Sequence, residues 1–476
     1  MNIDILKQLF SHTTGANPTT IQLLKQSGSS RQYARLSDGE TSVIGCYNEN
    51  VDENEAFFHL TEIFRKQNLN VPQILQIDES RKYYLQVDLG DNHLYDKVIN
   101  RTDQYLGSDL IDLYKNVLGK LVDFQTVKSD LFDHSKFYPV HSFNRASVGW
   151  DLDYFKYYFL KLNDIAFSDR DLNNDFETLI DHVLNDNTSY FMYRDFQSRN
   201  IMLVDDEPWF IDYQGGRRGP LAYDVASLLY QAKARITDSD RSILLKHYIE
   251  ILKTKVDIDE KRFLNYYYPI ALIRVLQTLG AYGYRGFYQK KSHFLQSINY
   301  ALDNLVSLLP NLVALEFVPT LKRCLLELID KRDVYKVSKD SNFQVVVNSF
   351  SYINGGVPND YSGHGGGYAF DCRLLPNPGR LQEYKKLTGM DADVQAWLKQ
   401  YPEVDEYLND TFSLIKRHVE AYQERGFSYL AVNFGCTGGQ HRSVYCAENV
   451  SRMLKEMFPD IQIKVNHMMQ HKSYTL

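Results

Sequence analysis

Three polar residues in the middle of the chain have the types and spacing that phosphoryl transfer from ATP requires. Asp195 and Asn200 lie five positions apart in the segment YRDFQSRN, and Asp212 ends an apolar run twelve positions after Asn200. At this spacing one loop can present a carboxylate to an acceptor hydroxyl and an amide oxygen to Mg²⁺. Asp212 would then supply a second metal ligand from the end of a strand.

Taken singly, each of these residues would be better explained as a helix cap or a turn residue. The joint pattern is improbable by chance: D-x4-N, a gap of hairpin length, and a strand that ends in Asp. A degraded, non-catalytic kinase is the alternative interpretation. It is disfavoured because all three positions are intact.

The flanking sequence predicts the elements that would position such a site. Residues 20–90 alternate β-like runs with turns, around a stretch at 56–67 with helical spacing of apolar residues. Residues 105–325 are mostly helical and are interrupted by the segment that carries the three polar residues. We predict an α+β bilobal protein-kinase-like domain over 1–330, with lobes at about 1–90 and 91–330, followed by a small α/β domain.

The segments MYRDFQSRNIM and WFIDYQGGRRGPLAYDVASLL resemble the aminoglycoside-phosphotransferase and choline-kinase superfamily. SGSSRQYARL, VPQIL and YYLQVDLGDNHL most resemble its anomeric N-acetylmuramate and N-acetylglucosamine kinases, and the likeness covers roughly 20–300. It implies an ATP- and Mg²⁺-dependent kinase for a sugar hydroxyl. Asp195 would be the catalytic base, Asn200 and Asp212 the magnesium ligands, and Asp224 a buried brace of the catalytic loop.

Two departures from that family concern the catalytic loop and the phosphate grip. Tyr193 stands where histidine is usual, and the predicted strand TSVIGCY lacks the lysine that holds the ATP phosphates. Arg31 or Arg35 could replace the lysine, because an arginine fork suits phosphate oxygens; ordinary solvation of a hairpin explains both arginines equally well. Ser29 and Ser30, in the loop before them, are the other predicted ATP-binding residues.

A second constellation lies beyond a charged, apolar-poor linker that we place at 331–342, in a domain at 343–476. A predicted strand, a glycine-rich loop and a predicted helix follow one another near its end. Such a junction can bind phosphate through backbone N–H groups and the positive end of the helix, with an arginine fork alongside. A glycine turn with a buried cysteine is the alternative. The predicted phosphate-binding residues are Cys436, Thr437, Gly438, Gly439, Gln440, His441, Arg442 and Ser443.

Residues 343–468 resemble the C-terminal domain of the RNase adapter protein RapZ, most specifically in GCTGGQHRSV. The resemblance implies an amino-sugar phosphate as ligand and, in some bacteria, small RNA as partner. The RNA role is weakly supported, because residues 343–476 hold 13 Lys and Arg against 14 Asp and Glu. A non-catalytic adapter that binds RNA or a partner protein is nevertheless the competing class of function for the chain.

The same loop has the spacing of a cysteine-based phosphatase, in which a thiolate at a helix N-terminus attacks phosphorus. Cys436 and Arg442 are separated by five residues. No aspartate is clearly placed as a general acid, so this alternative ranks behind phosphate binding.

The overall composition limits the binding partners and the cellular compartment that are plausible for the chain. The net charge of −7 does not favour a nucleic-acid or membrane-surface partner, and no apolar run reaches membrane-spanning length. Five scattered cysteines without a CxxC pair favour a reducing cytoplasm. The sequence does not identify the acceptor sugar or the oligomeric state.

Overall fold

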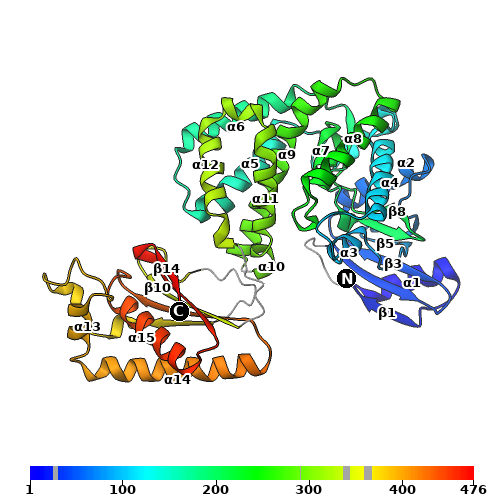
Figure 1. The fold of residues 1–476 in the computed structure, drawn as a ribbon. Helices are drawn as coiled ribbons and strands as arrows, with labels where there is room; N and C mark the ends of the chain where they lie inside the picture. The colour runs from blue at the N-terminus through cyan, green and yellow to red at the C-terminus, as the bar shows by residue number, and fades with distance from the viewer. Residues whose placement is uncertain (25–30, 290, 336–342, 359–366) are drawn as a thin grey trace. The chain divides into compact units, whose positions relative to one another are not determined.

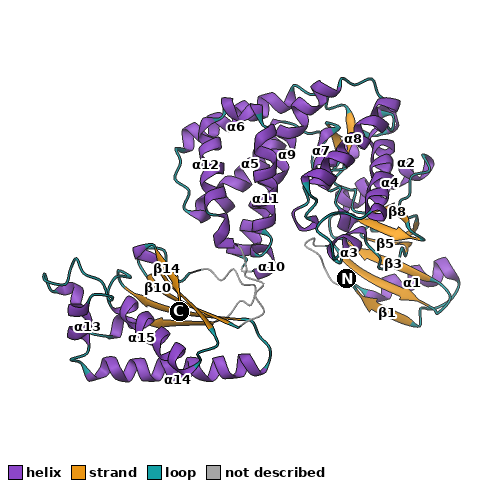
Figure 2. Ribbon diagram, viewed as in Figure 1, coloured by secondary structure: helices purple, strands orange, loops and turns teal. Residues whose placement is uncertain are grey.

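The computed structural model describes residues 1–24, 31–289, 291–335, 343–358 and 367–476. The predicted loop serines Ser29 and Ser30, and most of the predicted linker, lie outside these residues. The chain forms two compact units, one of Met1–Tyr284 with Ser297–Arg332 and the other of Arg285–Gln296 with Asp333–Leu476. Each unit is described by itself (Figures 1 and 2).

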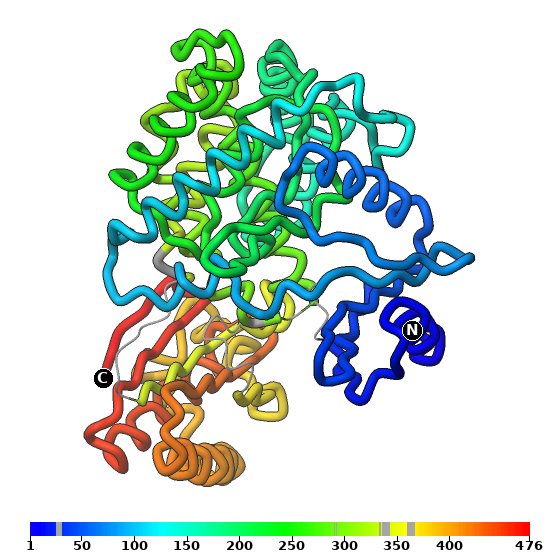
Figure 3. Tube along the Cα trace, turned by 90° about the vertical axis from the view of Figure 1, so that its right-hand side faces the viewer, coloured from blue at the N-terminus to red at the C-terminus, as the bar shows by residue number. Residues whose placement is uncertain are grey.

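The small lobe of the first unit is a five-stranded antiparallel sheet in the order β1-β2-β3-β5-β4. Its strands are β1 (Thr20–Leu23), β2 (Gln32–Ser37), β3 (Ser42–Tyr47), β4 (Ile74–Ile77) and β5 (Tyr83–Val87). Helix α1 (Ile3–Thr14) lies against these strands (Figure 3) and buries Leu6 and Phe10 in the core of the sheet.

Helix α2 (Val51–Lys66) joins the small lobe to the large lobe. Asn50 caps it by accepting a hydrogen bond from the backbone N–H of Glu53 at 3.1 Å, which fixes its first turn directly after β3. Further along, the buried ring of Phe64 packs edge-on against Phe124 and Phe191 of the large lobe. The helix is thereby held at both ends, and Glu53 has a fixed position.

The large lobe is helical. Its helices are α3 (Leu94–Ile99), α4 (Ser108–Gln125), α5 (Arg145–Phe155), α6 (Asp169–Leu184), α7 (Ala222–Leu229), α8 (Asp238–Lys255), α9 (Glu260–Gly283), α11 (Ile298–Leu308) and α12 (Pro319–Asp330). Helices α5 and α9 pack closely because α9 carries glycine at the contact: a Cβ at Gly280 would lie 2.8 Å from the backbone nitrogen of Phe155 on α5. The crossing holds α5 firmly in the lobe.

Two short two-stranded sheets interrupt the helices. Strand β6 (Tyr190–Met192) pairs with β9 (Arg217–Gly219), and β7 (Ile201–Val204) pairs with β8 (Glu207–Phe210). The loop between β6 and β7 and the loop between β8 and β9 carry the three predicted catalytic and metal residues. The predicted α+β bilobal kinase-like architecture is confirmed.

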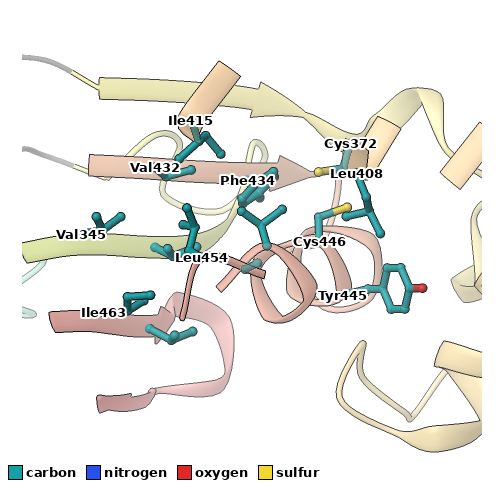
Figure 4. Packing of buried hydrophobic residues seen from close by; sticks show 14 of the residues in the cluster. Val345, Cys372, Leu408, Ile415, Val432, Phe434, Tyr445, Cys446, Leu454 and Ile463 are labelled. Carbon is teal, nitrogen blue, oxygen red and sulfur yellow. The ribbon is translucent and has the colours of Figure 1, made fainter. Parts of the chain in front are cut away.

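The second unit contains a five-stranded sheet in the order β11-β12-β10-β13-β14, parallel except at β14. Its strands are β10 (Gln344–Ser351), β11 (Gly367–Asp371), β12 (Tyr429–Cys436), β13 (Gln462–His467) and β14 (Lys472–Thr475). Its helices are α10 (Ser292–Leu295), α13 (Ala392–Leu398), α14 (Pro402–Glu424) and α15 (Arg442–Met457). Residues of α13, α14 and α15 share one apolar core with the sheet, and Figure 4 shows part of it. The predicted small α/β domain is confirmed.

Candidate active site

One buried carboxylate fixes the backbone of the catalytic loop. Asp224 on α7 is fully buried and accepts hydrogen bonds from the backbone N–H groups of Tyr193 (2.7 Å) and Arg194 (2.9 Å). Burial raises the pKa of Asp224 to about 7. The bracing role expected for Asp224 is confirmed, since its two acceptor oxygens fix the backbone immediately before Asp195.

The three predicted chemical residues come together in the structure. The Asn200 side-chain amide donates to the backbone carbonyl of Asp195 at 2.8 Å and to Asp212 Oδ2 at 3.2 Å. With its nitrogen used in this way, the Asn200 amide oxygen remains for a metal ion. Asp212 has a left-handed backbone, with φ of 70°, which turns the chain sharply after β8.

The environment of the Asp212 carboxylate favours a bound cation, because burial and a neighbouring negative charge both destabilise the ionised form when it has no partner. Burial first, and then the charge of Asp195, raise its pKa. Within the described part of the chain no cluster of three or more His, Cys, Asp or Glu side chains could hold a metal. Mg²⁺ in a kinase needs no such cluster, because phosphate oxygens and water complete its shell. The Asn200 and Asp212 oxygens therefore fit this ion.

Tyr193, in the position where histidine is usual, is a bracing residue. Its ring is buried, and its hydroxyl donates to the carbonyl of Ile211 at 2.6 Å. The tyrosine thus ties the loop of Asp195 to the residue before Asp212. The substitution alters the support of the site and leaves its chemical groups unchanged.

Arg194 forms a contact that the sequence did not predict. Its guanidinium makes a two-pronged ion pair with Asp151 on α5, at 2.9 and 3.0 Å, and also donates to the Tyr223 hydroxyl. Asp151 lies 43 residues earlier in a helix without a motif, so no local spacing could indicate the pair. The contact anchors the catalytic loop to the helical lobe.

Arg31 lies on the metal side of the site. Its Nη2 is 3.0 Å from Glu53 Oε1 on α2, and Gln214 donates both to Glu53 Oε1 (3.4 Å) and to Asp212 Oδ1 (2.8 Å). Burial opposes the charge on Arg31, but nearby Tyr84, Tyr33 and Glu53 hold its pKa above the ordinary value. Arg31 directly precedes β2, and a cation paired with a glutamate in the next helix is the arrangement that positions the phosphate-gripping lysine of protein kinases.

Arg35 has different partners. It stands four residues after Arg31 on an extended segment, about 13 Å along the chain. Its guanidinium is 2.7 Å from Asp88 Oδ2 and 2.9 Å from Asp91 Oδ1. Because this fork is already taken by two carboxylates, the structure favours Arg31 as the replacement for the missing lysine.

Arg217, on β9, is a buried arginine near the site that no sequence motif indicates. Its side chain is 6% exposed, and burial lowers its pKa to about 10, with the neighbouring charge of Arg194 contributing. Two adjacent arginines on a short strand give no sequence signal that distinguishes a buried one from an exposed one.

In the second unit, the predicted cradle is the loop between β12 and α15. Thr437 and Gly438 are exposed on it. Gly439 has φ of 67°, and a Cβ there would lie 2.5 Å from the Met469 side chain. Ser351 donates to the Thr437 carbonyl at 2.6 Å and fixes the start of the loop. A glycine is therefore required at 439, and the outer surface of the loop is formed by Thr437 and Gly438.

The polar side chains after Gly439 fasten neighbouring segments. Arg442 donates to the carbonyls of Arg373 (2.9 Å) and Leu375 (3.0 Å). Gln440 donates to the Leu387 carbonyl at 2.6 Å, and His441 Nε2 lies 2.9 Å from the Tyr384 carbonyl. These contacts indicate support of the loop. Direct phosphate binding by Arg442, Gln440 and His441 remains a prediction.

Cys436 is buried beneath the loop, with 3% of its surface exposed. Its sulfur lies 3.2 Å from the Ser443 hydroxyl at the start of α15. A phosphatase would need the thiol at the surface of the cradle and the guanidinium of Arg442 turned toward the phosphate. The observed placement favours packing roles for Cys436 and Ser443.

Comparison with known proteins assigns a family to the first unit. Residues 20–259 match the model of the phosphotransferase enzyme family, and residues 343–471 match the RapZ C-terminal domain. The chain is 39% identical over 140 residues to a nucleotide-binding protein of Alteromonas mediterranea, covering 29% of this chain and 47% of that one. A nucleotide-binding protein of Solibacter usitatus is 39% identical over 127 residues, with 27% and 37% covered. The chain thus spans less than half of the length of these relatives.

Solved structures similar to the chain include a choline kinase from Cryptosporidium parvum, with 12% identity and a TM-score of 0.44 over 70% of this chain and all of that one. An ethanolamine kinase from Plasmodium vivax has 12% identity and a TM-score of 0.43, over 61% and 82%. The assignment rests on the family model, whose match includes every residue of the Asp195, Asn200 and Asp212 site. Through residues 20–259, the chain belongs to the phosphotransferase enzyme family.

Proposed function

We propose that the first unit transfers the γ-phosphate of ATP to a hydroxyl group of a small amino sugar, in particular the anomeric hydroxyl of an N-acetyl amino sugar. The observation that carries this proposal is the bridge made by Asn200 between the Asp195 backbone and the Asp212 carboxylate. It supports a single site with a base on one side and metal ligands on the other.

In this mechanism the side chains have separate tasks. Asp195 accepts the proton of the acceptor hydroxyl as that oxygen attacks the γ-phosphorus, while the bond from phosphorus to the β–γ bridging oxygen breaks and ADP leaves. Asn200 and Asp212 would hold Mg²⁺, which when bound would neutralise charge on the phosphate oxygens. Arg31, oriented by Glu53, contacts the phosphates of ATP. Asp224, Tyr193 and Arg194 keep the catalytic loop in position.

The proposed activity is tested by incubating the full chain with radiolabelled ATP and Mg²⁺ and a panel of amino sugars, amino alcohols and aminoglycosides. We expect labelled product with N-acetyl amino sugars. We expect no product with the methyl glycosides of the same sugars, because their anomeric hydroxyl is blocked. Transfer to an amino alcohol or an aminoglycoside alone would overturn the choice of acceptor. Absence of transfer to every compound would favour the non-catalytic adapter.

For the second unit we propose binding of a sugar phosphate at the Thr437–Gly439 loop. The exposed Thr437 and Gly438, and the helix that begins at Arg442, support this assignment. The product of the first unit would be of the same chemical class as this ligand, so the second unit could sense it. RNA binding remains the alternative, and the domain's near-neutral charge does not favour it.

We place this activity in the cytoplasm. All five cysteines are free and buried, which fits a reducing compartment. Among the parts of the chain that the structure describes, no helix has the length and apolar character needed to span a membrane.

A further inference from the structure

The side chain of Arg217 is a buried cation next to the catalytic loop. Arg217 pairs in register with Met192, the residue before that loop begins. Its Nε donates to the Gly215 carbonyl at 3.0 Å. A Cβ at Gly215 would lie 3.9 Å from Asp195 Oδ2, so the backbone that holds Arg217 runs alongside the catalytic carboxylate.

Among the residues that the structure describes, no carboxylate lies within ion-pair distance of Arg217, although it is only 6% exposed. The neighbouring arginines are different. Arg194 is paired with Asp151, and Arg274 donates to the Tyr223 and Ser227 hydroxyls. A buried charge without a counter-charge costs free energy. A ligand that brings an anion would offset that cost.

The surroundings of Arg217 place it on the acceptor side of the site. The charges that act on it include those of Arg194, Asp195 and Asp151, which belong to the catalytic loop and α5. Arg31, by contrast, is paired with Glu53, which Gln214 links to the metal residue Asp212. The site therefore has one arginine near the metal ligands and a second beside the base.

We propose that Arg217 binds an anionic substituent of the acceptor and thereby selects an acidic sugar over neutral and cationic ones. This inference rests on the proposed function, because it assumes that the acceptor is a sugar. A carboxylate fits the guanidinium fork in a two-pronged contact. A cationic acceptor such as an amino alcohol would be repelled at the same point.

The test uses three acceptors with the full chain, ATP and Mg²⁺: N-acetylmuramic acid, its carboxyl methyl ester, and N-acetylglucosamine. For the wild type we expect kcat/KM to be 10- to 100-fold higher for the acid than for the ester, mainly through KM, as loss of a charge-assisted hydrogen bond implies. In Arg217→Gln the acid and the ester should be used equally well. The ester comparison needs no mutation, so it holds even if a variant fails to fold.

Arg218→Ala is the matched control. Arg218 is the next residue on β9, is exposed and lies on the other face of the strand, so its loss should leave the acid preference intact. Arg217→Gln should also leave the unfolding midpoint unchanged or higher, because it removes an uncompensated buried charge. A merely structural arginine would show a lower midpoint instead.

Three results would overturn the inference. The wild type could use all three acceptors equally well, which would refute acid selection while leaving the proposed kinase activity intact. Arg217→Gln could lower kcat to the same extent for all three acceptors, which would indicate that the guanidinium contacts the transferred phosphoryl group and not the acceptor. Absence of transfer to any acceptor would refute the proposed function, and the inference with it.

Discussion

The Asn200 side-chain nitrogen lies 3.2 Å from Asp212 Oδ2 and 2.8 Å from the Asp195 carbonyl oxygen. A single amide thus links the loop that carries the base to the strand end that carries the metal ligand. Because Asp195 precedes and Asp212 follows the β7–β8 hairpin, the amide also sets the distance between the acceptor side and the metal side of the site.

Removing the charged metal ligand should abolish metal-dependent nucleotide binding. In Asp212→Ala, only the uncharged Asn200 amide remains to hold Mg²⁺. We expect calorimetry to show no Mg²⁺-dependent gain in ATP affinity, whereas the wild type shows one. Since burial and Asp195 raise the pKa of Asp212, this gain should also weaken as the pH falls, because protonation removes the ligand. An unchanged Mg-ATP affinity in the variant would refute the metal assignment.

The two candidate arginines can be separated by a matched pair of variants. Arg31→Ala should raise the KM for ATP by about 10-fold or more, the effect of losing a charged hydrogen-bonding partner. Arg35→Ala should change it little, because its guanidinium is bound to Asp88 and Asp91. Steady-state kinetics at saturating acceptor measure both. The reverse order of effects would assign the phosphate grip to Arg35.

The buried brace should make the stability of the first unit depend on pH. The folded pKa of Asp224, about 7, lies above its unfolded value near 4, so the folded state holds the proton more tightly. Stability is therefore highest at low pH and is lost as pH rises from about 4 to about 7. Between pH 5 and 7 the wild type should lose on the order of 2 kcal/mol relative to Asp224→Asn, which does not titrate there.

Urea unfolding of both proteins at the two pH values measures this difference. Equal pH dependence of the wild type and Asp224→Asn would show that Asp224 titrates alike in the folded and unfolded states.

The grouping of the chemical residues and the brace Asp224 could be predicted from sequence, whereas the support that Arg194 gives could not. Asp195, Asn200 and Asp212 lie within 18 residues, and their spacing is set by one hairpin, so the pattern is local. The pair of Arg194 with Asp151 depends on how α5 packs in the lobe, which no local spacing encodes.

Three further arginines also show that local sequence does not determine which partners a side chain contacts. Arg31 and Arg35 stand four positions apart on an extended segment and so share a face, which is why strand alternation cannot separate them. Arg442 has the right type and spacing for a phosphate ligand, yet its guanidinium donates to the carbonyls of Arg373 and Leu375. Type and spacing do not determine the direction of a long side chain.

The C-terminal loop offers a test of binding against catalysis. With N-acetylglucosamine 1-phosphate as the probe, the full chain should bind it without releasing phosphate, and Cys436→Ser should bind equally well. Thr437→Val should weaken binding, because it removes the exposed hydroxyl of the loop. Arg442→Ala should chiefly lower the stability of the second unit, since two carbonyls lose their donor.

Calorimetry and a phosphate-release assay distinguish the outcomes. Steady phosphate release that Cys436→Ser abolishes would establish a cysteine-based phosphatase in place of a binding site.

The most direct test of the central claim is the rate of phosphate transfer from ATP to an N-acetyl amino sugar, compared between the wild type and Asp195→Asn. The substitution keeps the size of the side chain and the backbone contact with Asn200, but it removes the base. The account predicts a folded variant that still binds Mg-ATP and turns over about 10²- to 10⁴-fold more slowly. Near-normal turnover of Asp195→Asn with every sugar that the wild type phosphorylates would contradict it.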